Sequence, residues 1–190
     1  MRLFRTSPAE ESAAAAYRSV VAHSRNPDFF AKFGVPDTLD GRFELICLHA
    51  FLYLHRLKRE RPSADALSQH FVDLVFVDMD RSLRELGTGD LSVGRQVKRM
   101  AQALYGRIDA YEKALAEDRA TLAAALARNL FGTVSEPERY SDDMALYVQR
   151  QAALLRTERV SDLLAGRVIF SPPALDQRVA PSTVAEAEAT

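Results

Sequence analysis

The sequence predicts an all-α protein that folds as a single compact multi-helix domain of about six to eight helices. Its eight glycines and eight prolines cluster at a few positions among 190 residues. Between them, apolar residues recur at three- and four-residue spacing, the period of a helix with one buried face. No alternating apolar and polar run longer than about five residues occurs, so no half-buried strand is expected.

Capping and breaking residues set the helix bounds in the first half of the chain. Ser7 followed by proline is a favoured helix start, and Asn26-Pro27 interrupts that helix. Arg61-Pro62 stops a long helix with a wide apolar stripe, and Ser63 is expected to cap the next one. The expected elements are a helix to about residue 23, a short aromatic piece at 29–33, a turn at 34–38, a helix to about 60 and a helix at 64–86.

The second half continues the same pattern after Gly87 and Gly89. Ser92 is expected to cap a helix of about five turns, with a break near Asp118 before an alanine-rich helix. The remaining expected elements are a helix around 144–155, a short helix at 160–164 and an extended piece at 167–170. The expected organisation is an N-terminal helix and lead-in at 1–26, a helical domain at 27–170 and a disordered tail at 171–190.

Composition excludes several classes of protein. The 25 basic and 26 acidic residues give a net charge of −1, so the broad positive field of most nucleic-acid binders is missing and no DNA partner is expected. The apolar run at 45–54 is too short to span a bilayer, and the N-terminus lacks the apolar stretch of a signal peptide. We expect a cytoplasmic protein whose membrane contact, if any, is peripheral, at the inner face of the cell membrane.

Enzymatic and metal-binding signals are weak. Cys47 is the only cysteine and lies among aliphatic residues, where a thiol is usually an inert hydrophobe, and His49 on the same helix is expected to be buried and hydrogen-bonded. His70 and Asp73 share a helix face but have no second copy of the pattern, as a di-iron bundle would need. No phosphate-binding loop or nucleophile motif occurs. We therefore expect no catalytic residue, no metal and no cofactor.

Two basic clusters are candidates for contact with the phosphates of lipid or RNA. The first, Arg56, Lys58 and Arg59, lies near a helix C-terminus, where the dipole favours cations and a solvated helix end is the simpler interpretation. The second lies at the start of a helix, where the dipole gives no such benefit. It consists of Arg95, Lys98 and Arg99.

Four sequence blocks, in their order and approximate spacing, resemble the ubiquinol-cytochrome c chaperone family over about residues 27–170. The blocks are Gly34-Val35-Pro36-Asp37-Thr38-Leu39-Asp40-Gly41-Arg42-Phe43-Glu44, Asp78-Met79-Asp80-Arg81-Ser82-Leu83-Arg84-Glu85 with Gly89-Asp90, Tyr105-Gly106-Arg107 and Ala110-Tyr111.

The resemblance implies a helical chaperone without enzyme activity that binds newly made cytochrome b for assembly of the ubiquinol-cytochrome c oxidoreductase, respiratory complex III. In mitochondrial members it also implies a small partner chaperone and contact near the ribosome exit. Only about 25 residues precede the matched region, which leaves no room for a mitochondrial targeting extension and is typical of a bacterial member.

A chaperone for an apolar client needs a concave apolar surface with a polar rim. Phe29, Phe30 and Phe33 are the first candidates for it, with ordinary core residues as the alternative for each. Glycine at Gly41 and Gly106 would let neighbouring segments approach closely. The other candidate client-binding residues come from the family blocks: Pro36, Asp37, Asp40, Arg42, Phe43, Glu44, Asp80, Arg84, Glu85, Asp90, Tyr105, Arg107 and Tyr111.

Two further interpretations stay open. The same groove would also suit a small helical lipid- or quinone-binding protein or enzyme. The four charged residues Asp80, Arg81, Arg84 and Glu85 can pair along their own helix at i,i+4 spacing, or with Arg42, Glu44 or Arg107 of neighbouring helices.

Overall fold

The computed structural model describes residues 7–85 and 87–175, and for residues 90 and 91 it describes the backbone alone. Within these residues there are eight α-helices, one 3-10 helix and no strand, which confirms the all-α prediction. The helices are α1 (Pro8–Ser24), α2 (Asp28–Ala31), α3 (Leu39–Leu57), α4 (Asp65–Glu85), α5 (Asp90–Ala116), α6 (Arg119–Asn129), α7 (Glu138–Thr157) and α8 (Val160–Leu164), with the 3-10 turn η1 (Lys58–Glu60) after α3.

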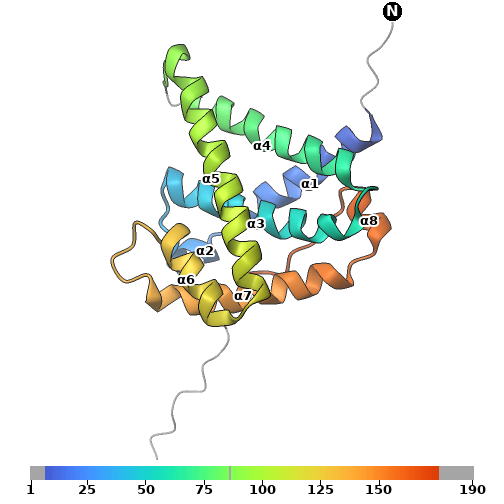
Figure 1. Cartoon of the computed structure of the whole chain (residues 1–190). Helices are drawn as coiled ribbons and strands as arrows, with labels where there is room; N and C mark the ends of the chain where they lie inside the picture. Colours follow the sequence, from blue (N-terminus) through green and yellow to red (C-terminus); the bar gives the residue numbers. More distant parts are fainter. Residues whose placement is uncertain (1–6, 86, 176–190) are drawn as a thin grey trace, which may run out of the picture.

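Helix α3 is the centre of the fold and packs against α1, α5 and α7 (Figure 1). It begins where the side chain of Thr38 accepts a hydrogen bond from the backbone N–H of Gly41 at 3.1 Å. Most of its residues are buried, because other helices cover it on more than one side. The wide apolar stripe expected from the sequence is therefore the main part of the core.

Helix α1 packs along α4 and also contacts α3. Its start is a capping box, in which Ser7 and Glu10 bond each other's backbone N–H groups. It buries Ala13, Ala16 and Val20 in the same core that α3 occupies. The segment expected as a lead-in is thus packed into the helical body.

Helix α5 crosses in front of α3 and connects α4 to the pair formed by α6 and α7 (Figure 1). The break between α5 and α6 comes at Asp118, as expected, where its side chain accepts a hydrogen bond from the N–H of Thr121 at 2.8 Å. The second half of α4 and the N-terminal two thirds of α5 hold the site residues described below.

Two expected caps are wrong by one or more residues. The segment 61–64 forms a turn, in which Asp65 N–H donates to the carbonyl of Pro62, and α4 begins at Asp65 without a Ser63 cap. Helix α5 begins at Asp90 because Gly89 has extended backbone angles, and Ser92 lies inside the first turn with its hydroxyl donating to the Gly89 carbonyl. Local turns shift the first residue of both helices, and the spacing of residues in the sequence does not reveal such turns.

The chain after α8 forms no regular element through residue 175, and its Val168 and Phe170 pack into the core. Gly166 makes the turn with φ +73°, and a Cβ there would lie 2.0 Å from the carbonyl oxygen of Ser12. Gln151 then holds Ser171, whose hydroxyl accepts from the amide at 2.6 Å and whose N–H donates to Gln151 Oε1 at 2.9 Å. The expected tail therefore begins as a packed segment, and its residues 176–190 lie outside the described part of the chain.

In the part of the chain that the structure describes, no helix is both long and apolar enough to traverse a bilayer.

Candidate functional site

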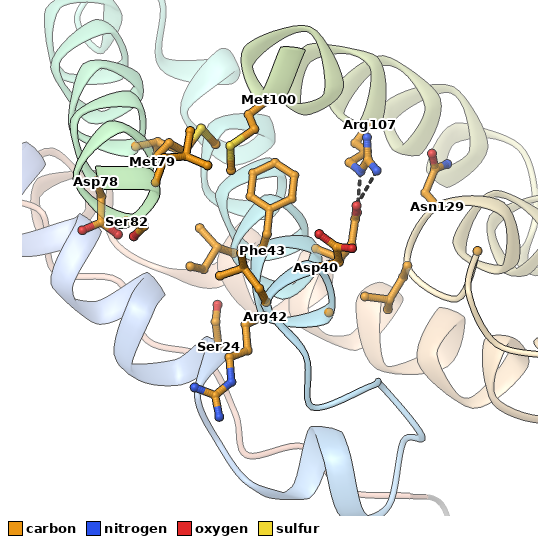
Figure 2. A pocket seen from close by; sticks show the side chains of 18 of the residues that line it. Ser24, Asp40, Arg42, Phe43, Asp78, Met79, Ser82, Met100, Arg107 and Asn129 are labelled. Atoms are coloured by element: carbon orange, nitrogen blue, oxygen red, sulfur yellow. Dashed lines mark hydrogen bonds and ion pairs between the residues drawn. The ribbon is translucent and has the colours of Figure 1, made fainter. Parts of the chain in front are cut away.

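A groove of about 610 Å³ opens between α1, the start of α3, α4 and α5, and extends to the turn after α6. Helices α4 and α5 form one side of it and the first turns of α3 form its floor (Figure 2). A volume in this range fits several apolar side chains of a partner or one medium-sized ligand.

The floor of the groove is apolar and rich in methionine. Phe43 projects from α3 toward Met79 of α4 and Met100 of α5 (Figure 2). Leu39, in the first turn of α3, is 52% exposed although it is a large aliphatic residue. The other apolar residues of the lining are Ile46, Val75, Leu83 and Leu130.

An ion pair between Glu44 of α3 and Arg107 of α5 closes one end of the floor (Figure 2). Two guanidinium nitrogens donate to the two carboxylate oxygens, a third bond goes to the Ala103 carbonyl, and the guanidinium lies 5.9 Å from the Phe43 ring centre. Burial raises the pKa of Glu44, and Arg107 opposes that shift. The pair thus holds α5 against α3 and places a fixed polar group beside Phe43.

Polar side chains form the opposite rim. The hydroxyl of Tyr17 on α1 donates to Asp78 of α4 at 2.7 Å, and Arg81 lies 3.3 Å from the same carboxylate. Burial, together with the bond to Asp78, raises the pKa of Tyr17, so the phenol stays neutral. Ser82 and Gln96 complete this side of the lining. An apolar floor between polar rims is the arrangement expected for a surface that binds an apolar segment.

Five of the residues expected to bind a client line this groove: Asp40, Arg42, Phe43, Glu44 and Arg107. Gly41 meets its expected close approach, since a Cβ there would lie 2.0 Å from the Pro36 carbonyl oxygen. Gly106 does not, because a Cβ there would meet no atom within 4 Å. Arg42 is also bonded to Asp37 at 2.8 Å, on the exposed side of the turn before α3.

Among the candidate client-binding aromatic residues, Phe29, Phe33 and Tyr111 are core instead. These three rings are at most 1% exposed, and Phe30 is partly buried against the core. The first two pack with a cluster of rings around Tyr147, which lies far away in the sequence. Phenylalanines beside a proline turn can face either side, and here the fold turns them inward.

The remaining candidates lie outside the groove. Asp80 pairs with Arg84, and Arg81 lies 3.8 Å from Glu85, so these charges pair along α4 rather than with Arg42, Glu44 or Arg107. Tyr105 is 54% exposed on α5 and contacts Phe76 edge-on. Pro36 and Asp37 belong to the turn before α3 and do not line the groove. The side chain of Asp90 lies outside the described residues.

In the first basic cluster, only Arg56 is removed from the surface. It is 6% exposed, donates to the Leu155 carbonyl at 2.9 Å and also pairs with Glu60, so it has a structural role. Lys58 and Arg59 are exposed, and Lys58 is bonded to Glu112 at 2.7 Å. In the second cluster Arg95, Lys98 and Arg99 are all exposed.

A buried polar network lies behind the groove, around Tyr147 of α7. The Tyr147 hydroxyl lies 2.8 Å from Nε2 of both His23 and His49, and His49 Nδ1 lies 2.7 Å from the Leu45 carbonyl. Because a carbonyl only accepts, His49 Nδ1 carries its proton, so Tyr147 donates to His49 Nε2 and accepts from His23. Burial lowers the pKa of His23 to about 4 and that of His49 to about 3.

Removal of the Tyr147 hydroxyl should test this network. We expect Tyr147→Phe to lower the free energy of unfolding by about 1–3 kcal/mol, because His49 Nε2 is left without a donor in the core. Urea denaturation measures the change. Tyr105→Phe is the matched control, since its hydroxyl is on an exposed ring, and it should change stability by less than about 0.5 kcal/mol. Equal effects of the two variants would contradict the assigned bonds.

Metal and thiol chemistry find little support in the described part of the chain. No group of three or more histidine, cysteine or acidic side chains there could hold a metal ion. Cys47 is fully buried, and burial raises the pKa of its thiol. His70 and Asp73 are not joined by a third ligand.

The sequence does not show that part of the core also lines the groove. The helical spacing of Met79 and Met100 indicates core, and Met79 is buried and Met100 partly buried against the core, yet both line the groove. Leu39 follows a cap, and its exposure could not be predicted. A periodic stripe shows that a helix face is apolar, but it does not show whether another helix covers that face. One signal was present: Phe43 and Ile46 widen the apolar stripe of α3 beyond what a single contact needs.

Comparisons with known proteins agree with the sequence blocks. A family model described as ubiquinol-cytochrome C chaperone matches residues 31–170. The ubiquinol-cytochrome-c reductase complex assembly factor 1 of Xenopus laevis is 29% identical over 146 residues, which cover 76% of this chain and 73% of that protein. The human protein of the same name is 28% identical over 157 residues, which cover 82% of this chain and 52% of that protein. The yeast protein CBP3, mitochondrial, from Saccharomyces cerevisiae, is 27% identical over 150 residues, which cover 76% of this chain and 44% of that protein.

A solved structure is also similar. The crystal structure of the Cbp3 homolog from Brucella abortus matches with a TM-score of 0.78 and 40% sequence identity, over 86% of this chain and 91% of that one. The chain spans about half the length of the human relative, whereas it covers nearly the whole Brucella structure.

Proposed function

Because the chain belongs to the ubiquinol-cytochrome c chaperone family, we propose that it is an assembly factor that binds newly made cytochrome b in the groove between α3, α4 and α5. Relatives named as assembly factors of the ubiquinol-cytochrome c reductase complex support the assembly role. The groove supports the binding of an apolar client.

The strongest support is an exposed apolar side chain at the groove. Leu39 is half-exposed beside the partly buried Phe43, in a first turn of α3 where Asp40 and Arg42 are exposed as well. Apolar surface left open to water costs free energy that a client segment recovers when it covers the surface. A client helix with one apolar face could place one apolar residue on Phe43 and the apolar residues next to it against α4 and α5.

The two methionines suit a client that presents different segments as it is made. Met79 and Met100 are unbranched and have more rotatable bonds than leucine, so their side chains adapt to differently shaped partners. The ion pair of Glu44 and Arg107 at the end of the floor then offers both a donor and an acceptor to a polar group of the client. The groove would thus accept apolar segments without requiring one sequence.

Leu39→Asp is the sharpest test of this groove. An aspartate in the first turn of α3 is favoured by the helix dipole, so the fold should remain intact, while a charge enters the apolar floor. We expect recovery of cytochrome b with the tagged chain, crosslinked in its own host, to fall about tenfold, which corresponds to about 1.4 kcal/mol of binding free energy. Quantitative mass spectrometry of the membrane fraction measures it.

Val77→Asp is the matched control, since Val77 is 64% exposed on α4 and does not line the groove. It should leave the recovery unchanged, and circular dichroism should show both variants folded. Equal recovery with wild type and Leu39→Asp would place the client elsewhere. If cytochrome b is absent while the complex is being made, and native mass spectrometry finds a stoichiometric lipid or isoprenoid, the groove binds a small ligand instead.

Other parts of the role extend this proposal. The client is a membrane protein, so the chain would act at the cytoplasmic face of the membrane without spanning it. A small partner chaperone and contact with the ribosome exit region are further proposals, and the same crosslinking experiment reports on both. No catalytic step is needed, because the groove only has to shield an apolar segment until it is inserted.

A further inference from the structure

We propose that the outer face of α5, formed by Arg95, Lys98, Arg99 and Tyr105 and called here the α5 outer face, docks the protein on the anionic lipid headgroups of a bilayer. This rests on the proposed function for its purpose, because a cytochrome b chaperone must deliver its client to a membrane. The binding itself can be tested independently.

The first argument is that the three cations of the α5 outer face lack acidic partners. Elsewhere on the surface, lysines and arginines are commonly paired within their own helix, as in Lys32 with Asp28 and Lys113 with Asp109. Arg95, Lys98 and Arg99 are exposed, and none has an acidic partner among the described residues. They lie in the second and third turns of α5, far from its C-terminus, so the helix dipole does not account for positive charge there.

The second argument is their arrangement. Residues 95, 98, 99, 102 and 105 follow three- and four-residue steps, so they share one side of α5 over about 15 Å. That side is exposed from Arg95 through Gln102 to Tyr105. Tyrosine is favoured where an apolar region meets water, because its ring can lie in the acyl boundary while its hydroxyl stays hydrated.

Lipid headgroups fit this face better than nucleic acid does. The chain carries a net charge of −1, so the cluster is a local patch and no continuous basic stripe tracks a phosphate backbone. The nearby charges of α4 are neutralised in pairs, as between Asp80 and Arg84. A short patch of cations with one aromatic residue suits headgroups, which present a flat array of single phosphates.

Docking in this orientation would serve the groove. Gln96 and Met100 of α5 line the groove, while Arg95 and Arg99 are exposed outside its lining. Helix α5 would therefore lie between the membrane surface and a client held in the groove. This orientation would keep the client close to the bilayer.

Flotation with vesicles tests the proposal on the full chain. The two vesicle types are phosphatidylcholine alone and phosphatidylcholine with about one third phosphatidylglycerol at low salt. We expect binding to the second only, and weaker binding as salt rises. The triple variant R95Q/K98Q/R99Q should bind on the order of 100-fold more weakly, since each cation near an anionic surface contributes about fivefold. Tyr105→Ala should weaken binding several-fold.

The control R18Q/R139Q/R156Q removes the same charge from exposed arginines on other helices, outside both basic clusters, and it should bind vesicles as the wild type does. Equal losses of vesicle binding in the two triple variants would show that net charge alone explains the binding, and this would overturn the proposal. The proposal would also be overturned if the wild type bound single-stranded RNA but not vesicles, and if R95Q/K98Q/R99Q abolished that RNA binding. Leu39→Asp should float normally, so loss of client recovery and loss of vesicle binding report on different faces.

Discussion

Arg107→Leu should lower the free energy of unfolding by about 3 kcal/mol at neutral pH, because it leaves Glu44 as an unpaired charge in a nearly buried position. Glu44 is 7% exposed, and its carboxylate is bonded to Arg107 through two guanidinium nitrogens. The loss should also weaken client recovery, since the pair joins α3 to α5 beside Phe43. Urea denaturation followed by circular dichroism measures the stability change.

The effect of this variant should depend on pH in a defined direction. Burial already raises the pKa of Glu44, and loss of Arg107 removes a contribution that lowers it, so the pKa rises further. A carboxyl whose pKa is higher in the folded than in the unfolded state binds more protons when folded, so stability increases as pH falls toward the unfolded value. The deficit of Arg107→Leu should therefore shrink between pH 7.5 and about pH 5.

Two comparisons isolate the pair. Lys113→Leu breaks an exposed i,i+4 pair with Asp109 on the same helix, and it should cost less than about 0.5 kcal/mol. The double variant E44L/R107L removes both charges and should recover much of the stability, as replacement of a buried pair by apolar residues often does. A deficit of Arg107→Leu that stays constant with pH would show that Glu44 is hydrated in the variant.

The helices could be predicted from the sequence because each is determined by short-range features. The interruption at Asn26-Pro27 and the cap at Asp118 act within a few residues of their own position. The run at 74–77 would suit a strand in isolation, but it continues a long helical period and is part of α4. The misplaced starts near Ser63 and Ser92 show the limit of this approach, because a turn can satisfy the same donors that a cap would.

The site could be predicted only in part, because it depends on which apolar faces stay uncovered. Phe29 and Phe43 look equivalent in sequence, yet the first packs against Tyr147 and the second faces the groove. The family blocks contain both Glu44 and Arg107 but not their contact, which joins residues 63 apart. Contacts at such separations follow from helix packing, which local spacing does not determine.

The second large effect is acid destabilisation through His49. Its pKa is lowered to about 3 by burial, against 6.5 for the ordinary group, so the unfolded chain binds a proton that the folded chain refuses. Stability therefore falls as pH decreases below about 6.5, and the loss continues until the pH reaches the folded pKa. Between pH 7 and pH 5 His49 alone should cost about 2 kcal/mol. His23, with its pKa at about 4, adds a smaller loss because it is partly exposed.

Denaturation of wild type and His49→Gln at both pH values tests this assignment. The variant loses the bond to Tyr147 and should be less stable at pH 7, but its further loss on acidification should be about 2 kcal/mol smaller than that of the wild type. Glu44 shifts stability in the opposite direction near pH 5, and comparison of the two proteins cancels that contribution. Val77→Gln, at an exposed position of α4, should keep the wild-type slope. If His49→Gln keeps that slope as well, the protons are taken up elsewhere, and the buried network does not account for the acid sensitivity.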